Sequence, residues 1–266
     1  MRIVLSGIAM LLIIGCHGSL TYTAAELEAF QGKELVIELR YRTRAGEQCS
    51  FYIAPKRDSS AVPSPLVIVY PGIISRAADW VAFAAGAPDS EAGFVLIDYP
   101  GRGKNGGIMR PRYLYESSAG AVSALAAHLD LKEERLTGDL KLLGHSFGGG
   151  AALQYATRTT PTRIVLVATF TTMHRLLATR FGPLAWFIPD GLDNEAALKL
   201  LSQRSQRPDV VIIHGSDDTS VPVAMGRALA GLYPDWIVYH ELEGQDHTRL
   251  LKEADMLIYE SLFAGE

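Results

Sequence analysis

The run KLLGHSFGGG, residues 141–150, constrains the chain more than any other stretch. A short apolar segment ends at Gly144, Ser146 follows two residues later, and a helix-forming segment begins soon afterwards. A serine at the tip of such a sharp strand-to-helix turn is strained, and glycine two positions to either side avoids collisions with strand and helix. The pattern G-x-S-x-G in this setting predicts a nucleophilic Ser146. A glycine-rich turn that packs closely and does no chemistry is the alternative.

The helix after Ser146 is expected to contribute to the chemistry. Backbone N–H groups at the start of a helix have no partner inside it, and the helix dipole places positive charge there. We therefore expect the N–H of Phe147 to bind the negative charge that develops on a substrate carbonyl oxygen. A nucleophilic serine also needs a base and an acid that orients the base, so other parts of the chain must supply both.

Length and composition narrow the class of protein. The 266 residues suit one large domain or two small ones, and the 48% of hydrophobic residues suffices for a substantial core. The net charge is −4 and both signs are scattered along the chain, so nucleic acid is not an expected partner. No spacing such as H-E-x-x-H predicts a metal site, and no cofactor is implied.

The N-terminus has the pattern of a targeting segment. Arg2 precedes an apolar run, and together they predict a signal peptide over residues 1–15. Residues 13–16, IIGC, resemble the bacterial lipobox, which implies diacylation of Cys16 and a lipid anchor in the membrane. His17 stands where an aspartate would favour the inner membrane, so the resemblance implies the outer membrane of a bacterial cell envelope. An ordinary buried first strand is the alternative.

The residues after the signal peptide are polar and mixed, and predict a tether over residues 16–31. If Cys16 carries lipid, Cys49 is the one remaining cysteine and no intramolecular disulfide can form. A disulfide between Cys16 and Cys49 is the alternative use of the two thiols.

Alternating apolar segments predict the fold of residues 32–266. Two strands in a hairpin come first, and strands then alternate with helices, which implies an α/β domain with a mostly parallel sheet and helices on both faces. Ligands of such sheets bind beyond the carboxyl ends of the strands, where Ser146 lies. The expected strands are 34–41, 48–54, 66–70, 94–97, 140–143, 163–168, 209–214 and 236–242, and the expected helices include 77–84, 113–131, 223–232 and 248–263.

The run HGSDDTSVP, residues 214–222, follows an apolar strand and matches the pattern H-G-x-x-D-x-x-V-P. At this point the chain resembles the α/β-hydrolase superfamily. The resemblance places the catalytic acid at Asp218, with Asp217 as the neighbour that is easily mistaken for it, and a helix N-cap as the alternative role. It places the catalytic base at His247, after the last strand. Ser146, Asp218 and His247 then follow in the order Ser…Asp…His.

Two further turns match the superfamily in part. In YPGI, residues 70–73, the resemblance makes the N–H of Ile73 the second oxyanion donor, although Pro71 stands where many members have histidine. A plain strand-to-loop turn is the alternative. The run DYPGRG that begins at Asp98 resembles a structural turn that borders the pocket. With Gly106 it also contains G-x-G-x-x-G, but a dinucleotide site is rejected because no helix opens at these glycines.

The superfamily inserts its cap between residues 168 and 209, and the short insertion predicts a small cap over about 171–208. Its apolar side chains either line an acyl pocket or belong to the core; they are Phe170, Met173, Leu176, Phe181, Leu184, Trp186, Phe187 and Ile188.

The resemblance extends from about residue 36 to 263, and is strongest to a compact, short-capped subgroup that includes protein depalmitoylases. It implies a serine hydrolase that acts on a carboxylic ester, a thioester or another acylated substrate; the depalmitoylase substrate is not carried over. The alternatives are a serine peptidase or amidase of the same fold, and a surface-anchored binding protein without turnover.

Overall fold

The structure is a computed structural model that describes residues 22, 36–187 and 191–263. The predicted signal peptide and the predicted lipidation site Cys16 lie outside the described residues, as does the predicted tether apart from Tyr22. Cys49 is a buried free thiol. No helix in the described ranges combines the length and the apolar composition needed to cross a bilayer.

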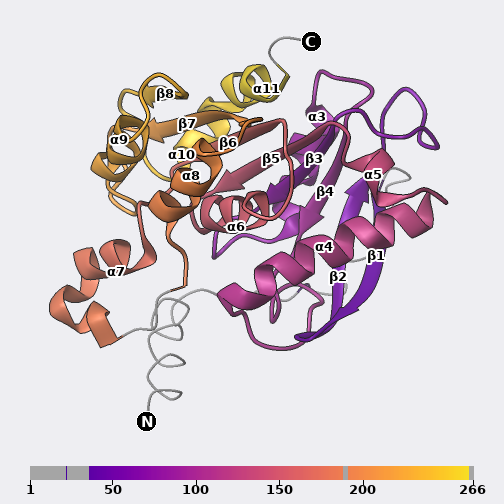
Figure 1. Cartoon of the computed structure of the whole chain (residues 1–266), viewed down its shortest axis with the longest axis horizontal. Coiled ribbons are helices and arrows are strands. Elements are labelled where there is room, and N and C mark those ends of the chain that lie inside the picture. Colours follow the sequence, from indigo (N-terminus) through magenta and orange to yellow (C-terminus); the bar gives the residue numbers. More distant parts are fainter. Residues whose placement is uncertain (1–21, 23–35, 188–190, 264–266) are drawn as a thin grey trace.

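In the described residues, eight strands form one sheet in the order β1-β2-β4-β3-β5-β6-β7-β8 (Figure 1). The hairpin partners β1 and β2 are antiparallel, β2 is antiparallel to β4, and all other neighbours are parallel. This confirms the predicted mostly parallel α/β sheet. The strands are β1 (Val36–Thr43), β2 (Gly46–Ile53), β3 (Leu66–Tyr70), β4 (Gly93–Ile97), β5 (Leu140–His145), β6 (Arg163–Val167), β7 (Asp209–Gly215) and β8 (Ile237–Leu242).

The burial of each strand follows from its sequence. Every residue of β3 (LVIVY) and of β4 (GFVLI) is buried. An apolar run without polar alternation suits a parallel strand that is covered on both faces. The edge strand β8 (IVYHEL) instead mixes apolar and polar residues and is largely exposed or half-buried. The central strands therefore position the loops at their carboxyl ends rigidly.

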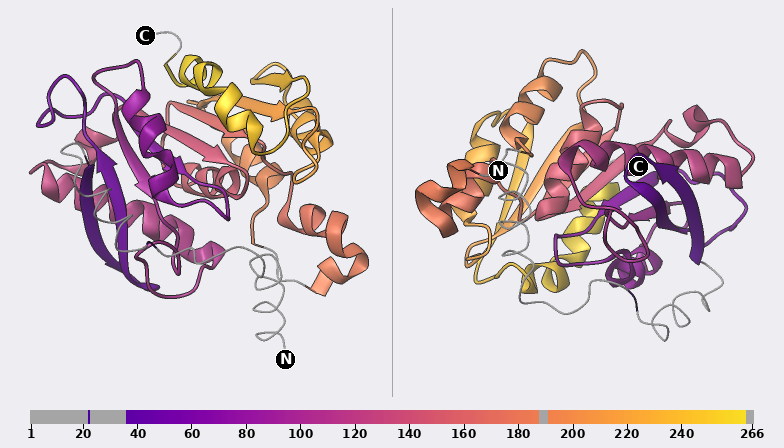
Figure 2. Two further views of the ribbon diagram at one scale, coloured as in Figure 1. Left: turned by 180° about the vertical axis from the view of Figure 1, so that it is seen from behind. Right: turned by 90° about the horizontal axis from the view of Figure 1, so that it is seen from below.

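Helices cover both faces of the sheet, as predicted. One layer contains α4, α6, α8 and α9 (Figure 1), and the opposite layer contains η1, α3, α10 and α11 (Figure 2). The helices are η1 (Ala77–Trp80), α3 (Val81–Gly86), α4 (Pro111–His128), α5 (Glu133–Leu136), α6 (Phe147–Ala156), α7 (Met173–Phe181), η2 (Gly182–Phe187), α8 (Asn194–Ser202), α9 (Val223–Gly231), α10 (Arg249–Glu253) and α11 (Asp255–Phe263).

The last predicted helix, over 248–263, is in fact two helices that meet at Ala254. The break keeps Leu250 and Ile258 in the same apolar cluster beneath the sheet, and both side chains are fully buried. Periodicity alone predicted one helix because the apolar spacing of four residues continues through the break.

The segment between β6 and β7 contains the predicted cap. Thr172 and Asp193 form an antiparallel bridge that closes its base. Beyond this bridge α7 and η2 project from the body, whereas α8 packs on α6 (Figure 1). Phe170 lies in the core, and Leu176 is half-buried against the same apolar cluster. The projecting part of the cap is therefore α7 and η2.

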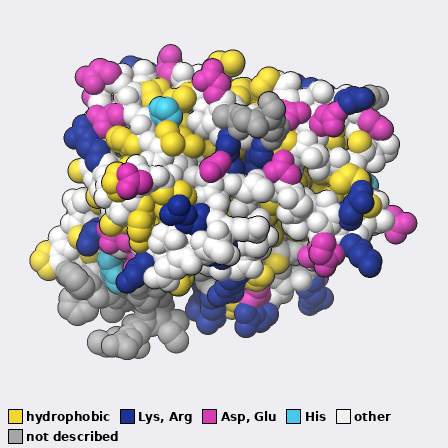
Figure 3. Space-filling model, turned by 45° about the horizontal axis from the view of Figure 1, so that its top comes forward, with side chains coloured by type: hydrophobic (Ala, Val, Ile, Leu, Met, Phe, Trp, Pro, Cys, Tyr) yellow, Lys and Arg dark blue, Asp and Glu magenta, His cyan; other side chains and the backbone are white. Residues whose placement is uncertain are grey.

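Charged side chains of both signs are interspersed on the face drawn in Figure 3. Ion pairs at the surface of the described residues include Arg44 with Glu116 and Arg227 with Glu241. Water screens such exposed pairs, so they contribute little to stability. The two apolar clusters that enclose the sheet are therefore the main source of stability.

Candidate active site

Ser146 lies at the tip of the turn between β5 and α6, as predicted. Its backbone has φ 55° and ψ −119°, a left-handed conformation that residues other than glycine rarely adopt. Hydrogen bonds hold the turn in place: the N–H of Ser146 donates to the carbonyl of Val167 at 2.8 Å, and its own carbonyl accepts from the N–H of Gly149 and the hydroxyl of Thr169, each at 3.0 Å. Strain that is held by surrounding contacts is typical of functional turns.

The two glycines of G-x-S-x-G are required by close backbone contacts. A Cβ on Gly144 would lie 2.5 Å from the carbonyl oxygen of Gly148, and a Cβ on Gly148 would lie 1.9 Å from the carbonyl oxygen of Tyr70. Both obstacles are backbone atoms, which cannot rotate away. The glycines thus allow β3, β5 and α6 to meet at Ser146.

We expect Gly148→Ala to lower the free energy of unfolding by about 2–3 kcal/mol, because the added methyl group forces β3 and α6 apart. Gly138→Ala is the matched control: there the nearest atom to the new Cβ is 3.8 Å away, an ordinary contact. Denaturant titration of both variants measures the difference. Equal midpoints for the two variants would show that the turn does not need its glycine.

Asp218 and His247, from the loops after β7 and β8, are brought together by the fold. Nδ1 of His247 lies 2.7 Å from Oδ2 of Asp218. The other carboxylate oxygen, Oδ1, accepts from the N–H groups of Ser220 and Val221, each at 2.8 Å. Burial opposes ionisation of Asp218, but hydrogen bonds from His214 and His247 outweigh it and hold the pKa of this carboxyl well below its usual range. Asp218 is therefore an anion that can orient an imidazole.

Asp217, the neighbour in sequence, points elsewhere. It is exposed, and its Oδ1 accepts from the hydroxyl of Ser216 at 2.8 Å. The geometry therefore favours Asp218 over Asp217 as the partner of His247.

His214 contacts the same acid from beneath. The side chain is fully buried, with Nε2 2.9 Å from the carbonyl oxygen of Val221 and 3.4 Å from Oδ2 of Asp218. A Cβ on Gly226 would lie 2.4 Å from Nδ1 of His214, so α9 also encloses the ring. This support for the acid was not predicted from the sequence, although His214 and Asp218 stand four residues apart in the same H-G-x-x-D run.

His145, which precedes Ser146, connects the serine turn to His247. The two imidazole rings lie 4.8 Å apart between centroids. Burial lowers the pKa of His145 to about 3, so this ring is neutral at physiological pH. Within the described part of the chain, the Ser146 hydroxyl makes no hydrogen bond to His247; such contacts often shorten only when substrate binds.

The predicted oxyanion donors come from two segments that meet near Ser146. Phe147 is the first residue of α6, so its N–H has no partner within the helix. The loop after β3 also comes close: a Cβ on Gly72 would lie 2.9 Å from Nδ1 of His145 and 3.7 Å from Cβ of Ser146. Ile73 is the next residue of this loop and is half-buried. Pro71 does not prevent the approach.

Residues 61–218 match the model of the family described as "Serine aminopeptidase, S33". The matched range covers more than half of the chain. The chain belongs to this family. It is an α/β serine hydrolase, and solved structures of such enzymes share its fold. No curated protein matches the sequence.

Three solved structures illustrate this likeness. An α/β serine hydrolase "without lid" from Xanthomonas campestris has 16% identity and a TM-score of 0.58, over 86% of this chain and 93% of that one. A Pyrococcus furiosus esterase has 13% identity and a TM-score of 0.63, over 91% and 92%. A Pyrococcus horikoshii acylaminoacyl peptidase has 12% identity and a TM-score of 0.60, over 90% and 42%. At these identities the likeness shows the fold alone.

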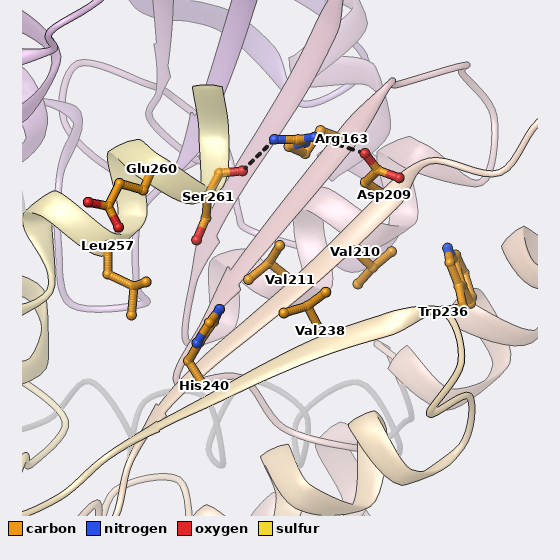
Figure 4. Close-up of a pocket in the computed structure, with 10 residues that line it drawn as sticks. All are labelled: Arg163, Asp209, Val210, Val211, Trp236, Val238, His240, Leu257, Glu260 and Ser261. Atoms are coloured by element: carbon orange, nitrogen blue, oxygen red, sulfur yellow. Dashed lines mark hydrogen bonds and ion pairs between the residues drawn. The ribbon is translucent and has the colours of Figure 1, made fainter. Parts of the chain in front are cut away.

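A groove of about 450 Å³ lies elsewhere on this α/β hydrolase, between β8 and α11 (Figure 4). Its walls include Val211, Val238 and Leu257, and Arg163 pairs with Asp209 at one end. The last two residues begin β6 and β7, so that end of the groove lies at the amino ends of the strands, opposite to Ser146. It contains none of the candidate catalytic side chains.

In the residues that the structure describes, no three or more His, Cys, Asp and Glu side chains are grouped so that they could hold a metal ion.

Proposed function

We propose that this chain hydrolyses carboxylic esters or thioesters through an acyl-enzyme on Ser146. The observation that carries the proposal is the 2.7 Å contact between His247 and Asp218, beside a serine that is held at positive φ. A strained serine, a histidine and a buried anion at the carboxyl ends of one sheet are the parts that nucleophilic acyl transfer requires.

In the proposed reaction, Nε2 of His247 accepts the hydroxyl proton of Ser146 while Oγ bonds to the substrate carbonyl carbon. His247 then gives this proton to the leaving alcohol or thiol as its bond to carbon breaks. A water molecule next attacks the acyl-enzyme and loses a proton to His247. The proton passes to Ser146 as the acid is released, which restores the starting state. Asp218 accepts from Nδ1–H throughout and keeps Nε2 available.

Both tetrahedral intermediates carry a negative oxygen. We assign its stabilisation to the N–H groups of Phe147, which begins α6, and of Ile73, which follows the Gly72 that approaches Ser146. Removal of one such donor typically lowers kcat by about 10²–10³.

Ester or thioester cleavage is favoured over aminopeptidase activity by the charges of the cap. An aminopeptidase must bind the ammonium group of its substrate, usually with a carboxylate. In the described part of the cap, Asp193 accepts from the N–H of Ala196 as the N-cap of α8, and Glu195 pairs with Arg175. Both carboxylates are thus already engaged. The family name still makes a peptidase or amidase the main alternative.

We also propose that residues 1–15 are a signal peptide, that Cys16 is lipidated, and that the enzyme is anchored at the outer membrane of a bacterial envelope. The apolar run that ends in IIGC supports this proposal, as does His17. Cys16→Ser should abolish incorporation of an alkyne-labelled fatty acid, while Cys49→Ser, at a buried thiol, should leave it unchanged. Equal incorporation into both variants would exclude Cys16 as the lipidated residue.

We also propose that the chain belongs to the compact subgroup that includes protein depalmitoylases.

The proposed function is tested with a fluorophosphonate, followed by matched substrates. The wild-type chain should be labelled, and it should hydrolyse p-nitrophenyl esters or acyl thioesters faster than aminoacyl p-nitroanilides. Faster anilide cleavage would favour the peptidase. A folded chain that is not labelled and turns over none of these substrates would instead be the surface-anchored binding protein.

A further inference from the structure

Tyr22 is the one residue before Val36 that the structure describes, and it is held tightly against the body of the protein. Its hydroxyl donates to Oδ2 of Asp98 at 2.7 Å and accepts from the N–H of Ala78 at 3.1 Å. Its ring meets Phe51 edge-on, with centroids 6.0 Å apart, and the guanidinium carbon of Arg76 lies 5.2 Å from the ring centroid. Contacts from three separate parts of the chain therefore fix this side chain.

The side chain of Tyr22 occupies a socket that fits an aromatic ring. The residues that form this socket are Phe51, Arg76, Ala78, Asp98 and Gly103. Gly103 has φ 57°, and a Cβ there would lie 2.9 Å from Cε2 of Tyr22 and 2.1 Å from Oδ2 of Asp98. Burial raises the pKa of the Tyr22 hydroxyl far above its usual value, so the group remains a hydrogen-bond donor. Burial also raises the pKa of Asp98, to about 6, so at neutral pH its anion accepts that hydrogen bond.

The socket is continuous with the loop that carries the candidate oxyanion donor. The N–H of Ala77 donates to Oδ1 of Asp98 at 2.8 Å, next to the contact between Ala78 and Tyr22. At its other end, the same loop is fixed by the hydroxyl of Tyr99, which donates to the carbonyl oxygen of Pro71 at 2.7 Å. Ile73 lies between these two fixed ends.

We propose that Tyr22 is a positioning residue for the oxyanion hole. Tyr99 holds one end of loop 71–78, and Tyr22 with Asp98 forms a clamp on the other end, at Ala77 and Ala78. A residue that precedes the hydrolase domain in sequence thereby holds Ile73 in place. The role in catalysis rests on the proposed function. Without the hydroxyl, the N–H of Ala78 loses its acceptor and Asp98 loses a donor, so this end of the loop keeps the bond from Ala77 to Asp98 but loses the two bonds beside it. The oxyanion donor is then less well preorganised, which affects the transition state more than substrate binding.

The test uses the full-length chain with Tyr22→Phe, which keeps the ring and removes the hydroxyl. We expect kcat for a p-nitrophenyl ester to fall about tenfold with KM unchanged, a smaller loss than removal of a donor itself would cause. We also expect the amides of Ala77 and Ala78 to exchange with deuterium faster, as measured by mass spectrometry. This second measurement does not depend on any enzymatic activity.

Tyr41→Phe is the matched control. The Tyr41 hydroxyl lies 2.8 Å from that of Ser50 within the β1–β2 hairpin, and makes no contact with loop 71–78 among the described interactions. This variant should also lose stability, but its kcat and the exchange of Ala77 and Ala78 should match the wild type.

The outcomes separate the two ideas. If the wild-type chain is labelled by fluorophosphonate and Tyr22→Phe keeps its kcat, the positioning role is overturned, whatever the stability of the variant. If Tyr22→Phe leaves the exchange of Ala77 and Ala78 unchanged, the clamp itself is overturned. If the wild type is not labelled, the proposed function fails, and unchanged or faster exchange in the variant still decides whether the clamp exists.

Discussion

Replacing Ser146 by alanine is expected to lower kcat for ester hydrolysis by a factor on the order of 10⁴–10⁶, because no other group can form the acyl-enzyme. The remaining rate would come from substrate binding and the oxyanion donors. Alanine retains Cβ, so the strained turn at φ 55° is preserved and the variant should remain folded. Initial rates with p-nitrophenyl esters, and loss of fluorophosphonate labelling, measure the effect.

Ser202→Ala provides the comparison for this prediction. Ser202 ends α8, and its hydroxyl donates to the carbonyl of Lys199 within the same helix. This variant should keep wild-type labelling and turnover. If Ser146→Ala retained more than about one hundredth of the wild-type rate, Ser146 could not be the nucleophile.

Asp218→Asn is expected to lower kcat about 10⁴-fold. The carboxylate accepts from Nδ1 of His247 at 2.7 Å and so keeps Nε2 available as the base. An asparagine whose amide nitrogen faces Nδ1 would favour the opposite tautomer, with the proton on Nε2. Asp217→Asn changes the same chemical group one residue away, at an exposed position, and should leave kcat within about twofold of the wild type. The reverse result would assign the acid to Asp217.

Asp218→Asn is also expected to change how the stability of the fold depends on pH. The folded-state pKa of Asp218 is below its usual value, so the unfolded chain binds the proton more readily. The ionised carboxylate therefore stabilises the fold above about pH 4, and this stabilisation is lost as the pH falls through the lower, folded-state pKa. Asp218→Asn should remove this contribution.

Features fixed by local contacts were predictable from the sequence. Gly144 and Gly148 must be glycine because backbone atoms lie within about 2–3 Å of a Cβ at either position, and the spacing around Ser146 already implied such crowding. The buried strands were predictable because continuous apolar runs suit few other environments. The structure also brings Asp218 beside His247, as the resemblance to α/β hydrolases implied.

Contacts between distant residues were not predictable in the same way. Tyr22 and Asp98 are 76 positions apart, and neither residue carries a pattern that points to the other. The contact between the rings of His145 and His247 likewise depends on how two loops meet above the sheet. The break at Ala254 was missed because the apolar period on its two sides is the same.

The socket of Tyr22 also sets how far the hydrolase domain can move from a lipid bilayer. Tyr22 is six positions after Cys16, and a fully extended chain of that length spans about 20 Å, whereas Val36 is twenty positions after Cys16, which could span about 70 Å. With Cys16 lipidated as proposed, a docked Tyr22 shortens the reach of the anchor more than threefold. The hydrolase domain would then stay close to the membrane surface, where amphiphilic acyl substrates are concentrated. Release of the Tyr22 side chain from its socket would increase the distance that the domain can reach from the bilayer.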